Sequence, residues 1–413
     1  MPRAESVCRL CKAPLKDSLV DLGMSPLANS YVKPADVQRM ERFYPLHVYV
    51  CRSCLLAQLE EFESPQEIFG DYAYFSSFSD AFLKHAKTYV DMMTPRFGLN
   101  AKSLVVEVAS NDGYLLQYFR ERGIPVLGIE PAANVAAVAR EKGIPTETKF
   151  FGVATAKALV AEGKQADLML GNNVLAHVPD VNDFVGGFKI ALKPTGVLTV
   201  EFPHLMQLMA HRQFDTIYHE HFSYYSFLVA QRMFAQHGLR VFDVEEIWTH
   251  GGSLRVFCAH DNDASKPTGD RVRELEQRER KAGFDKIEHY QAFGEGVAEV
   301  KRQLLTFLIE AKRKGKRIVG YGAPAKAITL LNYCGVRNDF IEYTVDRSPY
   351  KQNHYLPGVH IPIYEPDRIR QTKPDYIMIF AWNLREEIMQ QMAYVREWGC
   401  KFVVPLPEVK VFD

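Results

Sequence analysis

The fold of this chain is indicated most clearly by the segment Val105-Val106-Glu107-Val108-Ala109-Ser110-Asn111-Asp112-Gly113. It begins as a short apolar run and ends in small and polar residues, which is typical of a buried strand that turns into a helix. Further apolar runs follow at 126–130, 168–172 and 197–202, and helical segments separate them. This alternation predicts an α/β fold with a parallel sheet and helices on both of its faces.

The turn after Val108 is where such a sheet binds a ligand, because the carboxyl ends of parallel strands form a crevice there. Glu130, at the end of the next strand, is placed to accept hydrogen bonds from ribose hydroxyls. A dinucleotide needs several glycines in this turn, but only Gly113 is present. Glu107 and Asp112 also put negative charge where a diphosphate would lie. A sulfonium cofactor with an ammonium group tolerates that charge.

Four of the seven cysteines form two Cys-x-x-Cys pairs, Cys8 with Cys11 and Cys51 with Cys54. Two such pairs supply the four thiolates of a closed tetrahedral zinc site, which leaves no open position for chemistry. Disulfides are the first alternative, and reduced cytosolic thiols disfavour them. A thioredoxin-like redox pair is the second, but neither pair opens a helix in a βαβ unit. We therefore expect a structural zinc ion.

Length and charge limit the classes of function. A chain of 413 residues is too long for one ordinary core, so two or three domains are expected. Lys plus Arg equals Asp plus Glu, at 50 each, so no net charge attracts nucleic acid or an anionic membrane. No apolar run is long enough to span a bilayer, and the first residues lack a signal-peptide pattern. We expect a cytoplasmic protein without nucleic-acid or membrane partners, and both a monomer and a homodimer stay open.

The chain is expected to have three domains. Residues 1–70 form a zinc-binding module, residues 71–265 form the central α/β domain, and residues 266–413 form a second α/β domain with leading helices. The charged stretch at 273–317 is expected to supply those helices, because its second half has apolar positions at helical spacing. The Gly-x-Gly turn at 320–322 lacks the full phosphate-loop pattern, so nucleotide hydrolysis is not expected.

The segment E-V-A-S-N-D-G-Y-L-L (107–116), followed by G-I-E-P (128–131), resembles the first two motifs of class I S-adenosylmethionine-dependent methyltransferases. The glycines usually found at the positions of Ala109 and Asn111 are missing. Sugar C-methyltransferases, which act on nucleotide-linked keto-sugars, tolerate this departure. That family also has the four-cysteine module and the segments H-E-H-F, H-G-G-S-L-R and G-Y-G-A-x-A-K. All occur here in the same order, the last three at 219–222, 250–255 and 320–326.

The resemblance implies a class I methyltransferase domain and a C-terminal Rossmann-like domain that helps to hold the substrate. It implies S-adenosylmethionine and structural zinc as cofactors, and a nucleotide-linked, dTDP-type 4-keto-deoxysugar methylated at C-3. In that reaction a base removes the proton beside the ketone, and a donor stabilises the enolate. The alternative is a relative that binds S-adenosylmethionine or NAD without C-methylation. A nucleic-acid-binding zinc ribbon is disfavoured by the neutral charge.

The resemblance also assigns catalytic roles. His221 is expected to be the general base, with Glu220 as its partner or as a ligand of a sugar hydroxyl. Tyr218 and Tyr72 are candidate donors to the enolate oxygen. His177 follows the apolar run at 168–172, where methyltransferases place residues that face the methyl group. A hydrogen-bonded core network is the structural alternative for this tyrosine–histidine cluster.

The secondary structure of 218–221 decides part of this assignment. In a strand, His219 and His221 would share one face and Glu220 would point to the other. That arrangement would keep a metal site possible and would weaken Glu220 as a direct partner. A loop would remove both constraints.

The remaining expectations concern binding. The cofactor-binding candidates are Glu107, Ala109, Asn111, Asp112, Gly113, Glu130, Pro131, Phe151, Asn172 and Asn173. The substrate-binding candidates are Tyr74, Ser76, His219, Lys326, Asn332, Lys351 and Asn353. The last four are candidates for diphosphate or sugar contacts, and exposed loop positions are the alternative for each.

Overall fold

The computed structural model describes residues 6–64, 76–78 and 80–413, and the chain divides into two compact units. The first unit comprises Met1–Leu15, Cys51–His204 and Phe222–Asp285. The second comprises Lys16–Val50, Leu205–His221 and Lys286–Asp413. Both units are therefore discontinuous in sequence. The tyrosine–histidine segment 218–221 belongs to the second unit.

The first unit is built on a seven-stranded sheet with the order β10-β11-β8-β7-β4-β5-β6. Its strands are β4 (Val105–Val108), β5 (Val126–Ile129), β6 (Thr146–Glu147), β7 (Ala166–Asn172), β8 (Leu192–Pro203), β10 (Leu239–Ile247) and β11 (Ser253–His260). β4 to β8 run parallel, and β11 lies antiparallel to both β8 and β10. The predicted parallel sheet is confirmed. Because β4 lies between β5 and β7, the turn after β4 is the topological switch point.

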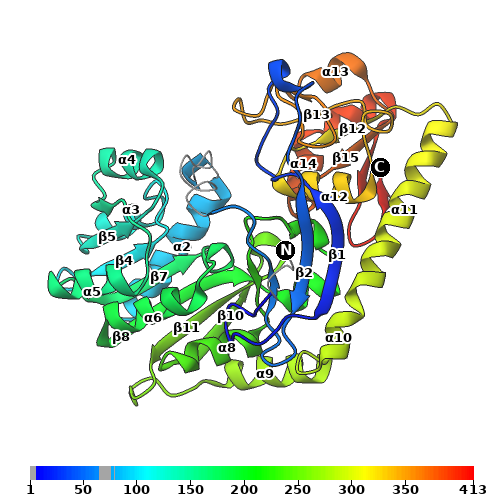
Figure 1. Cartoon of the computed structure of the whole chain (residues 1–413). Helices are drawn as coiled ribbons and strands as arrows, with labels where there is room; N and C mark the ends of the chain where they lie inside the picture. The colour runs from blue at the N-terminus through cyan, green and yellow to red at the C-terminus, as the bar shows by residue number, and fades with distance from the viewer. Residues whose placement is uncertain (1–5, 65–75, 79) are drawn as a thin grey trace. The chain divides into compact units, whose positions relative to one another are not determined.

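Helices lie on both faces of this sheet (Figure 1). They are α2 (Asp80–Arg96), α3 (Leu116–Arg120), α4 (Ala133–Glu141), α5 (Val153–Ala161), α6 (Val181–Ala191), α8 (Phe227–Gln236) and α9 (Asp270–Ala282), with short 3-10 turns η2 (Ser76–Phe78), η3 (Leu175–His177) and η5 (Thr249–Gly251). On one face, buried Tyr89 and Met93 of α2 pack in one core with Val105, Leu170 and Phe257 of the sheet. A short antiparallel pair, β3 (Ala57–Leu59) with β9 (Ser223–Tyr224), completes the unit.

The second unit has a six-stranded sheet with the order β14-β13-β12-β15-β16-β17. Its strands are β12 (Ile318–Tyr321), β13 (Thr344–Val345), β14 (Ile363–Tyr364), β15 (Tyr376–Ile379), β16 (Lys401–Val404) and β17 (Lys410–Phe412), and all but β17 are parallel to their neighbours. This is the predicted Rossmann-like pattern. Its switch point lies between the carboxyl ends of β12 and β15.

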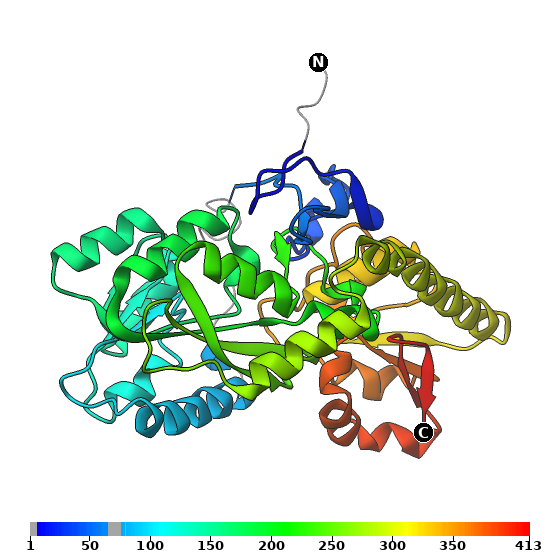
Figure 2. The ribbon, with the colours of Figure 1, turned by 90° about the horizontal axis from the view of Figure 1, so that it is seen from below.

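Helices and a hairpin complete the second unit. The helices are α7 (Leu205–Ala210), α10 (Ile287–Gln291), α11 (Phe293–Arg313), α12 (Ala325–Cys334), α13 (Arg368–Thr372) and α14 (Arg385–Gln391), with 3-10 turns η1 (Pro34–Asp36), η4 (Phe214–Thr216), η6 (Trp382–Leu384) and η7 (Ala393–Trp398). The hairpin consists of β1 (Asp17–Ser25) and β2 (Tyr44–Val50), and β1 packs against α10, α11 and α12. Figure 2 shows α12 beside the longer α11. Within the described part of the chain, no helix is both long and apolar enough to cross a membrane.

Candidate active site and metal centre

The four N-terminal cysteines form one cluster. Their sulfur atoms all lie within 4.8 Å of one another, and the Sγ atoms of Cys8 and Cys54, and of Cys11 and Cys51, are 3.5 Å apart. Sulfur atoms bound to one tetrahedral zinc at about 2.3 Å are separated by about 3.8 Å, so the cluster fits a zinc ion. Among the described residues it is the one group of three or more His, Cys, Asp or Glu side chains close enough to share a metal.

The two cysteine pairs have the same backbone geometry. Lys12 follows Cys11 with φ 62°, and Leu55 follows Cys54 with φ 63°. The N–H of Lys12 donates to the carbonyl of Cys8 at 2.9 Å, and the N–H of Leu55 donates to that of Cys51 at 2.7 Å. Each pair is therefore a tight knuckle that turns both sulfurs toward one point. With all four ligands supplied by the protein, the centre is structural rather than catalytic.

The turn after β4 keeps the backbone of a glycine-rich loop without its glycines. Ala109, Asn111 and Gly113 have φ values of 56°, 50° and 75°, so every second residue is left-handed. The N–H groups of Ala109 and Ser110 both donate to the carbonyl of Ile129, at 2.8 and 3.3 Å, which fixes the turn against β5. Asparagine visits this region more readily than most residues, whereas alanine is strained there. The departure from the methyltransferase motif therefore lies in the side chains, not in the course of the chain.

A buried carboxylate without a counter-ion marks this turn. Glu107 is 1% exposed, and neither of its carboxylate oxygens has a hydrogen-bond partner in the described structure. Burial raises the pKa of Glu107 well above its usual range, and the carboxylates of Glu130 and Asp112 raise it further. A buried, uncompensated carboxyl group is costly unless a cation joins it. The ammonium group of S-adenosylmethionine fits this requirement.

Glu130 has a second role that its position in the sequence did not predict. Its Oε2 accepts from the N–H of Asn111 and its Oε1 accepts from the N–H of Ala132, both at 2.9 Å. Burial raises the pKa of Glu130, and these two hydrogen bonds oppose the rise. The side chain thus stabilises the turn at 109–113, and its oxygens keep lone pairs for further hydrogen bonds. Pro131 directly follows it.

Further cofactor candidates lie after the neighbouring strand β7. Asn172 ends β7 and Asn173 follows with φ 55°. The side-chain carbonyl oxygens of both are buried without a hydrogen-bond partner in the described structure. The ring of Phe151 packs against those of Phe184 and Phe188, with centroids 5.6 and 4.9 Å away. His177 ends the 3-10 turn η3 that follows β7.

The segment before α2 contacts the turn at 109–113 through one backbone donor and one side-chain donor. The N–H of Ser76 donates to Oδ1 of Asn111 at 2.9 Å, and the hydroxyl of Ser77 donates to the carboxylate of Asp112. Ser76 was predicted to bind the substrate, and the structure places its backbone against the turn at 109–113. Tyr72 and Tyr74 lie outside the described residues.

In the second unit, the structure fixes the ring of His221 from two sides. Its Nδ1 lies 2.9 Å from the carbonyl oxygen of Thr216, and its ring lies 4.1 Å from that of Tyr218, centroid to centroid, at 34°. A carbonyl only accepts, so Nδ1 carries the proton and Nε2 is the basic nitrogen. His219 and Glu220 form a turn rather than a strand, closed by the N–H of His221, which donates to the carbonyl of Tyr218 at 2.9 Å, so the constraint of a shared strand face does not apply.

The two residues that precede His221 have partners in the N-terminal part of the same unit. The side-chain amide of Asn29 donates to Oε1 of Glu220 at 2.7 Å, and burial raises the pKa of Glu220 to about 7. Nε2 of His219 lies 3.3 Å from the carbonyl oxygen of Pro45, and burial lowers the pKa of His219. Sequence reasoning missed Asn29, because nothing in its local pattern indicates a partner 191 positions away.

Two predicted substrate-binding lysines flank the turn between β12 and α12. Nζ of Lys326, in the first turn of α12, donates to Oδ1 of Asn383 at 2.9 Å and lies 4.1 Å from the ring centroid of Trp382. Nζ of Lys351 donates to the carbonyl of Ala323 at 3.0 Å. Both lysines therefore lie near the switch point of the second sheet.

The two predicted asparagines of this unit hold loops. The side-chain amide of Asn332 donates to the carbonyls of Ile328 and Pro357, at 2.9 and 3.1 Å. Asn353 adopts φ 61°, and its backbone N–H donates to the carbonyl of Ile363. Their described contacts are thus with the protein backbone.

Comparison with known proteins relates these sites to one reaction. The chain is 36% identical over 406 residues to C-methyltransferase NovU from Streptomyces niveus, a match that covers 98% of this chain and 96% of that one. The chain belongs to the S-adenosylmethionine-dependent C-methyltransferase family. A part of this C-methyltransferase is also 30% identical to a ubiquinone biosynthesis O-methyltransferase of Paramagnetospirillum magneticum, over 34% of this chain and 57% of that one.

Three family models match successive parts of the C-methyltransferase. A zinc binding domain matches residues 8–69, a methyltransferase domain matches 82–244, and a C-methyltransferase C-terminal domain matches 248–407. Magnesium protoporphyrin IX methyltransferase from Synechocystis, with S-adenosylhomocysteine bound, aligns with 47% of this chain and 91% of its own, at 13% identity and a TM-score of 0.35. S-adenosylmethionine and structural zinc are the cofactors of this C-methyltransferase, as predicted.

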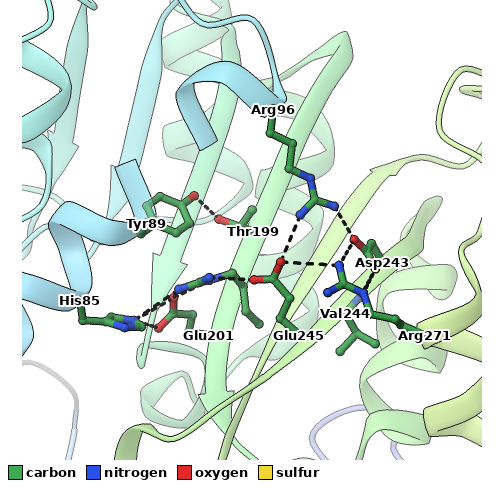
Figure 3. A network of polar contacts seen from close by, with 10 residues as sticks. His85, Tyr89, Arg96, Thr199, Glu201, Asp243, Val244, Glu245 and Arg271 are labelled. Atoms are coloured by element: carbon green, nitrogen blue, oxygen red, sulfur yellow. Dashed lines mark hydrogen bonds and ion pairs between the residues drawn. The ribbon is translucent and has the colours of Figure 1, made fainter. Parts of the chain in front are cut away.

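The C-methyltransferase also contains a charged network that the sequence did not reveal (Figure 3). Glu201 of β8 accepts hydrogen bonds from Arg255 of β11 and lies 2.9 Å from Nε2 of His85 on α2. From Arg255 the network continues to Glu245 on β10. The H-G-G-S-L-R segment contained Arg255, but only the structure gives its role. A charge in the middle of an apolar strand was the available signal at both Glu201 and Arg255.

Proposed function

We propose that this C-methyltransferase transfers a methyl group to C-3 of a dTDP-linked 4-keto-deoxysugar, with His221 as the base. S-adenosylmethionine, when bound, supplies an electrophilic methyl group. Glu107 and the turn at 109–113 hold it in the first unit, with Glu130 available to the ribose. The resemblance of the whole chain to sugar C-methyltransferases supports the choice of substrate class.

The hydrogen bond between His221 and Thr216 carries the assignment of the base. Nδ1–H is held by the carbonyl, so Nε2 takes up the proton from the carbon beside the ketone. The resulting enolate carbon then forms the new C–C bond as the methyl–sulfur bond breaks. The hydroxyl of Tyr218, on the ring next to His221, donates to the enolate oxygen.

Glu220 is proposed to bind the substrate rather than to orient His221. Its carboxyl group already accepts from Asn29, and a pKa near 7 allows it to be a hydrogen-bond donor or an acceptor toward a sugar hydroxyl. Lys326 and Lys351 are proposed to bind the diphosphate, since ammonium groups near a helix N-terminus suit phosphate oxygens.

The test is direct. Purified protein, S-adenosylmethionine with a labelled methyl group and a panel of dTDP-4-keto-deoxysugars should give one labelled sugar, whose methylated carbon is located by NMR. His221→Asn should lower turnover by about a hundredfold or more while the Kd for S-adenosylmethionine stays within about twofold. His211→Asn, at an exposed position of the same unit, is the matched control and should leave both unchanged. Full turnover in His221→Asn would remove this residue from the mechanism.

A calorimetric titration separates the cofactor from the substrate. We expect binding of S-adenosylmethionine and S-adenosylhomocysteine and no binding of NAD. A protein that binds S-adenosylmethionine but methylates no member of the sugar panel would refute the proposed substrate class. The cofactor assignment would stand in that case.

A further inference from the structure

The backbone that orients His221 is attached to helix α12 and to the turn η6 of the same unit. We name residues 214–218 the orienting strip, because it contains both Thr216 and Tyr218. The ring of Phe214 packs edge-on against Tyr333, with centroids 5.3 Å apart at 68°. The hydroxyl of Thr329 donates to the carbonyl of Ile217 at 2.7 Å, and this bond is buried. Tyr333 and Thr329 both belong to α12, so the strip lies along that helix.

Asp215 makes a third attachment. Its Oδ2 accepts from Nε1 of Trp382 at 2.7 Å, and Trp382 begins the turn η6 after β15. The Asp215 side chain is buried, and its Oδ1 has no hydrogen-bond partner in the described structure. Lys326, which lies over the Trp382 ring, is the charged group that favours the ionised form of Asp215. Burial nevertheless raises the pKa of Asp215 to about 6.

A single peptide bond connects Asp215 to Thr216, the residue that orients His221. Asp215 is followed by Thr216, whose carbonyl accepts from Nδ1 of His221. A rotation of the backbone at Asp215 would therefore move the acceptor that selects the tautomer of His221. The indole N–H of Trp382, 167 positions away in sequence, therefore anchors a buried carboxylate that lies next to the residue whose carbonyl orients His221.

We propose that Asp215 is a positioning residue for His221, which ties the orientation of that imidazole to Trp382 and Lys326 at the switch point of the C-terminal sheet. The inference rests on the proposed role of His221 as the base. An anionic group of the substrate at Lys326 would compete with Asp215 for the same ammonium group. Substrate binding at the switch point would thus change the orientation of His221 through Asp215.

The experiment compares three variants. Asp215→Ala removes the acceptor, Trp382→Phe removes the indole N–H donor and keeps one aromatic ring, and Asp339→Ala removes an exposed carboxylate of the same unit as the matched control. We expect Asp215→Ala and Trp382→Phe each to lower kcat by about tenfold or more, while the Kd for S-adenosylmethionine stays within about twofold. The double variant should be no slower than Asp215→Ala, because both changes break the same contact.

A spectroscopic readout separates this inference from the proposed function. In protein with ¹⁵N-labelled histidine, the two ring nitrogens of His221 are assigned by their loss in His221→Asn. We expect one tautomer, protonated at Nδ1, in the wild type and in Asp339→Ala, and a mixture in Asp215→Ala. An unchanged tautomer and an unchanged kcat in Asp215→Ala would overturn the inference. Retained turnover in His221→Asn would instead overturn the role of the base, whatever the tautomer shows.

Thr329 provides a second line of test if Asp215→Ala does not fold. Thr329→Val breaks the hydrogen bond to the carbonyl of Ile217 without a change of shape, and Thr329→Ser keeps it. We expect Thr329→Val to lower kcat and to broaden the His221 signals, and Thr329→Ser to restore both. Equal kcat values in the two variants would show that the strip does not control the base.

Discussion

Nη2 of Arg255 lies 2.6 Å from Oε1 of Glu201, and the two side chains are 2% and 1% exposed. They belong to the antiparallel neighbours β11 and β8, which pair Arg255 with Glu201 in register. The guanidinium also lies over the ring of Tyr89 and reaches Glu245 at 2.9 Å. Arg255 therefore forms ion pairs with two carboxylates, at the place in the sheet where strand pairing changes from parallel to antiparallel.

Replacement of Arg255 should destabilise the protein strongly. In Arg255→Met, Glu201 stays buried without its main counter-ion, and such broken pairs cost about 3–5 kcal/mol. The measurement is the free energy of unfolding from urea denaturation. The matched control is Arg271→Gln, since Arg271 is 52% exposed and pairs with Asp243 at the outer end of the same network. That change should cost no more than about 1 kcal/mol. Equal losses in the two variants would contradict a special role for the buried pair.

Zinc removal should unfold the N-terminal knuckles without direct damage to the methyl-transfer chemistry. Cys54→Ser removes one of four thiolates, so the metal content should fall from about one zinc per chain toward zero. Elemental analysis of the purified protein gives this ratio. The control is Cys400→Ser, because Cys400 lies in the second unit and outside the cluster. Full zinc occupancy in Cys54→Ser would show that the four cysteines do not share one ion.

The sequence predicted the elements of this protein better than its contacts. Apolar runs located β4, β5, β7 and β8, and the cysteine spacing located the metal centre, because both signals are local. The pairing of β11 between β8 and β10 was not predicted, since nothing local in a strand specifies its neighbour. The same limit hid the partner of Asp215, which lies 167 positions away.

The sequence motifs name candidate site residues, but the tertiary contacts of those residues could not be predicted from them. The H-E-H-F segment indicated His221, but nothing indicated its orienting partner Thr216. Every residue has a backbone carbonyl, so the sequence does not show which one accepts from the histidine. Ala109 shows the converse. Its side chain argued against a glycine-type turn, whereas the surrounding hydrogen bonds to Ile129 hold it in the left-handed conformation.

Glycine at position 109 should therefore stabilise the protein. In Ala109→Gly the strain of a left-handed alanine disappears. This relief is larger than the cost of the greater conformational entropy that glycine gives the unfolded chain, so the free energy of unfolding should rise by up to about 1 kcal/mol. The change in Tm by scanning calorimetry is the measurement. Ala158→Gly, at an exposed position inside α5, is the control and should lower stability by about 1 kcal/mol. A lower Tm in Ala109→Gly would mean that its methyl group makes packing contacts worth more than the strain.

Glu107 and Glu201 should respond to pH in opposite directions. Burial raises the pKa of Glu107, so the folded protein holds this proton after the unfolded chain has released it. The contribution of Glu107 to the free energy of unfolding therefore falls as the pH rises above the ordinary carboxyl pKa of about 4.3. Burial also acts on Glu201, but His85 and Arg255 together bring its pKa below the usual value. Its contribution is present above about pH 4.3 and is lost as the pH falls through the lower folded value.

The matched amide variants separate the two roles. Without cofactor, Glu107→Gln should raise the free energy of unfolding at pH 7, because glutamine neither has to take up a proton nor carries a charge in the buried site. The same change should weaken S-adenosylmethionine binding by about 10- to 100-fold, since a charge-assisted hydrogen bond to the ammonium group is lost. Glu201→Gln should lower stability at pH 7, because Arg255 loses its closest counter-ion. Urea denaturation at several pH values and calorimetric titration provide both measurements. Gain of stability together with loss of affinity identifies Glu107 as a residue kept for the cofactor, and loss of both would make it a structural residue instead.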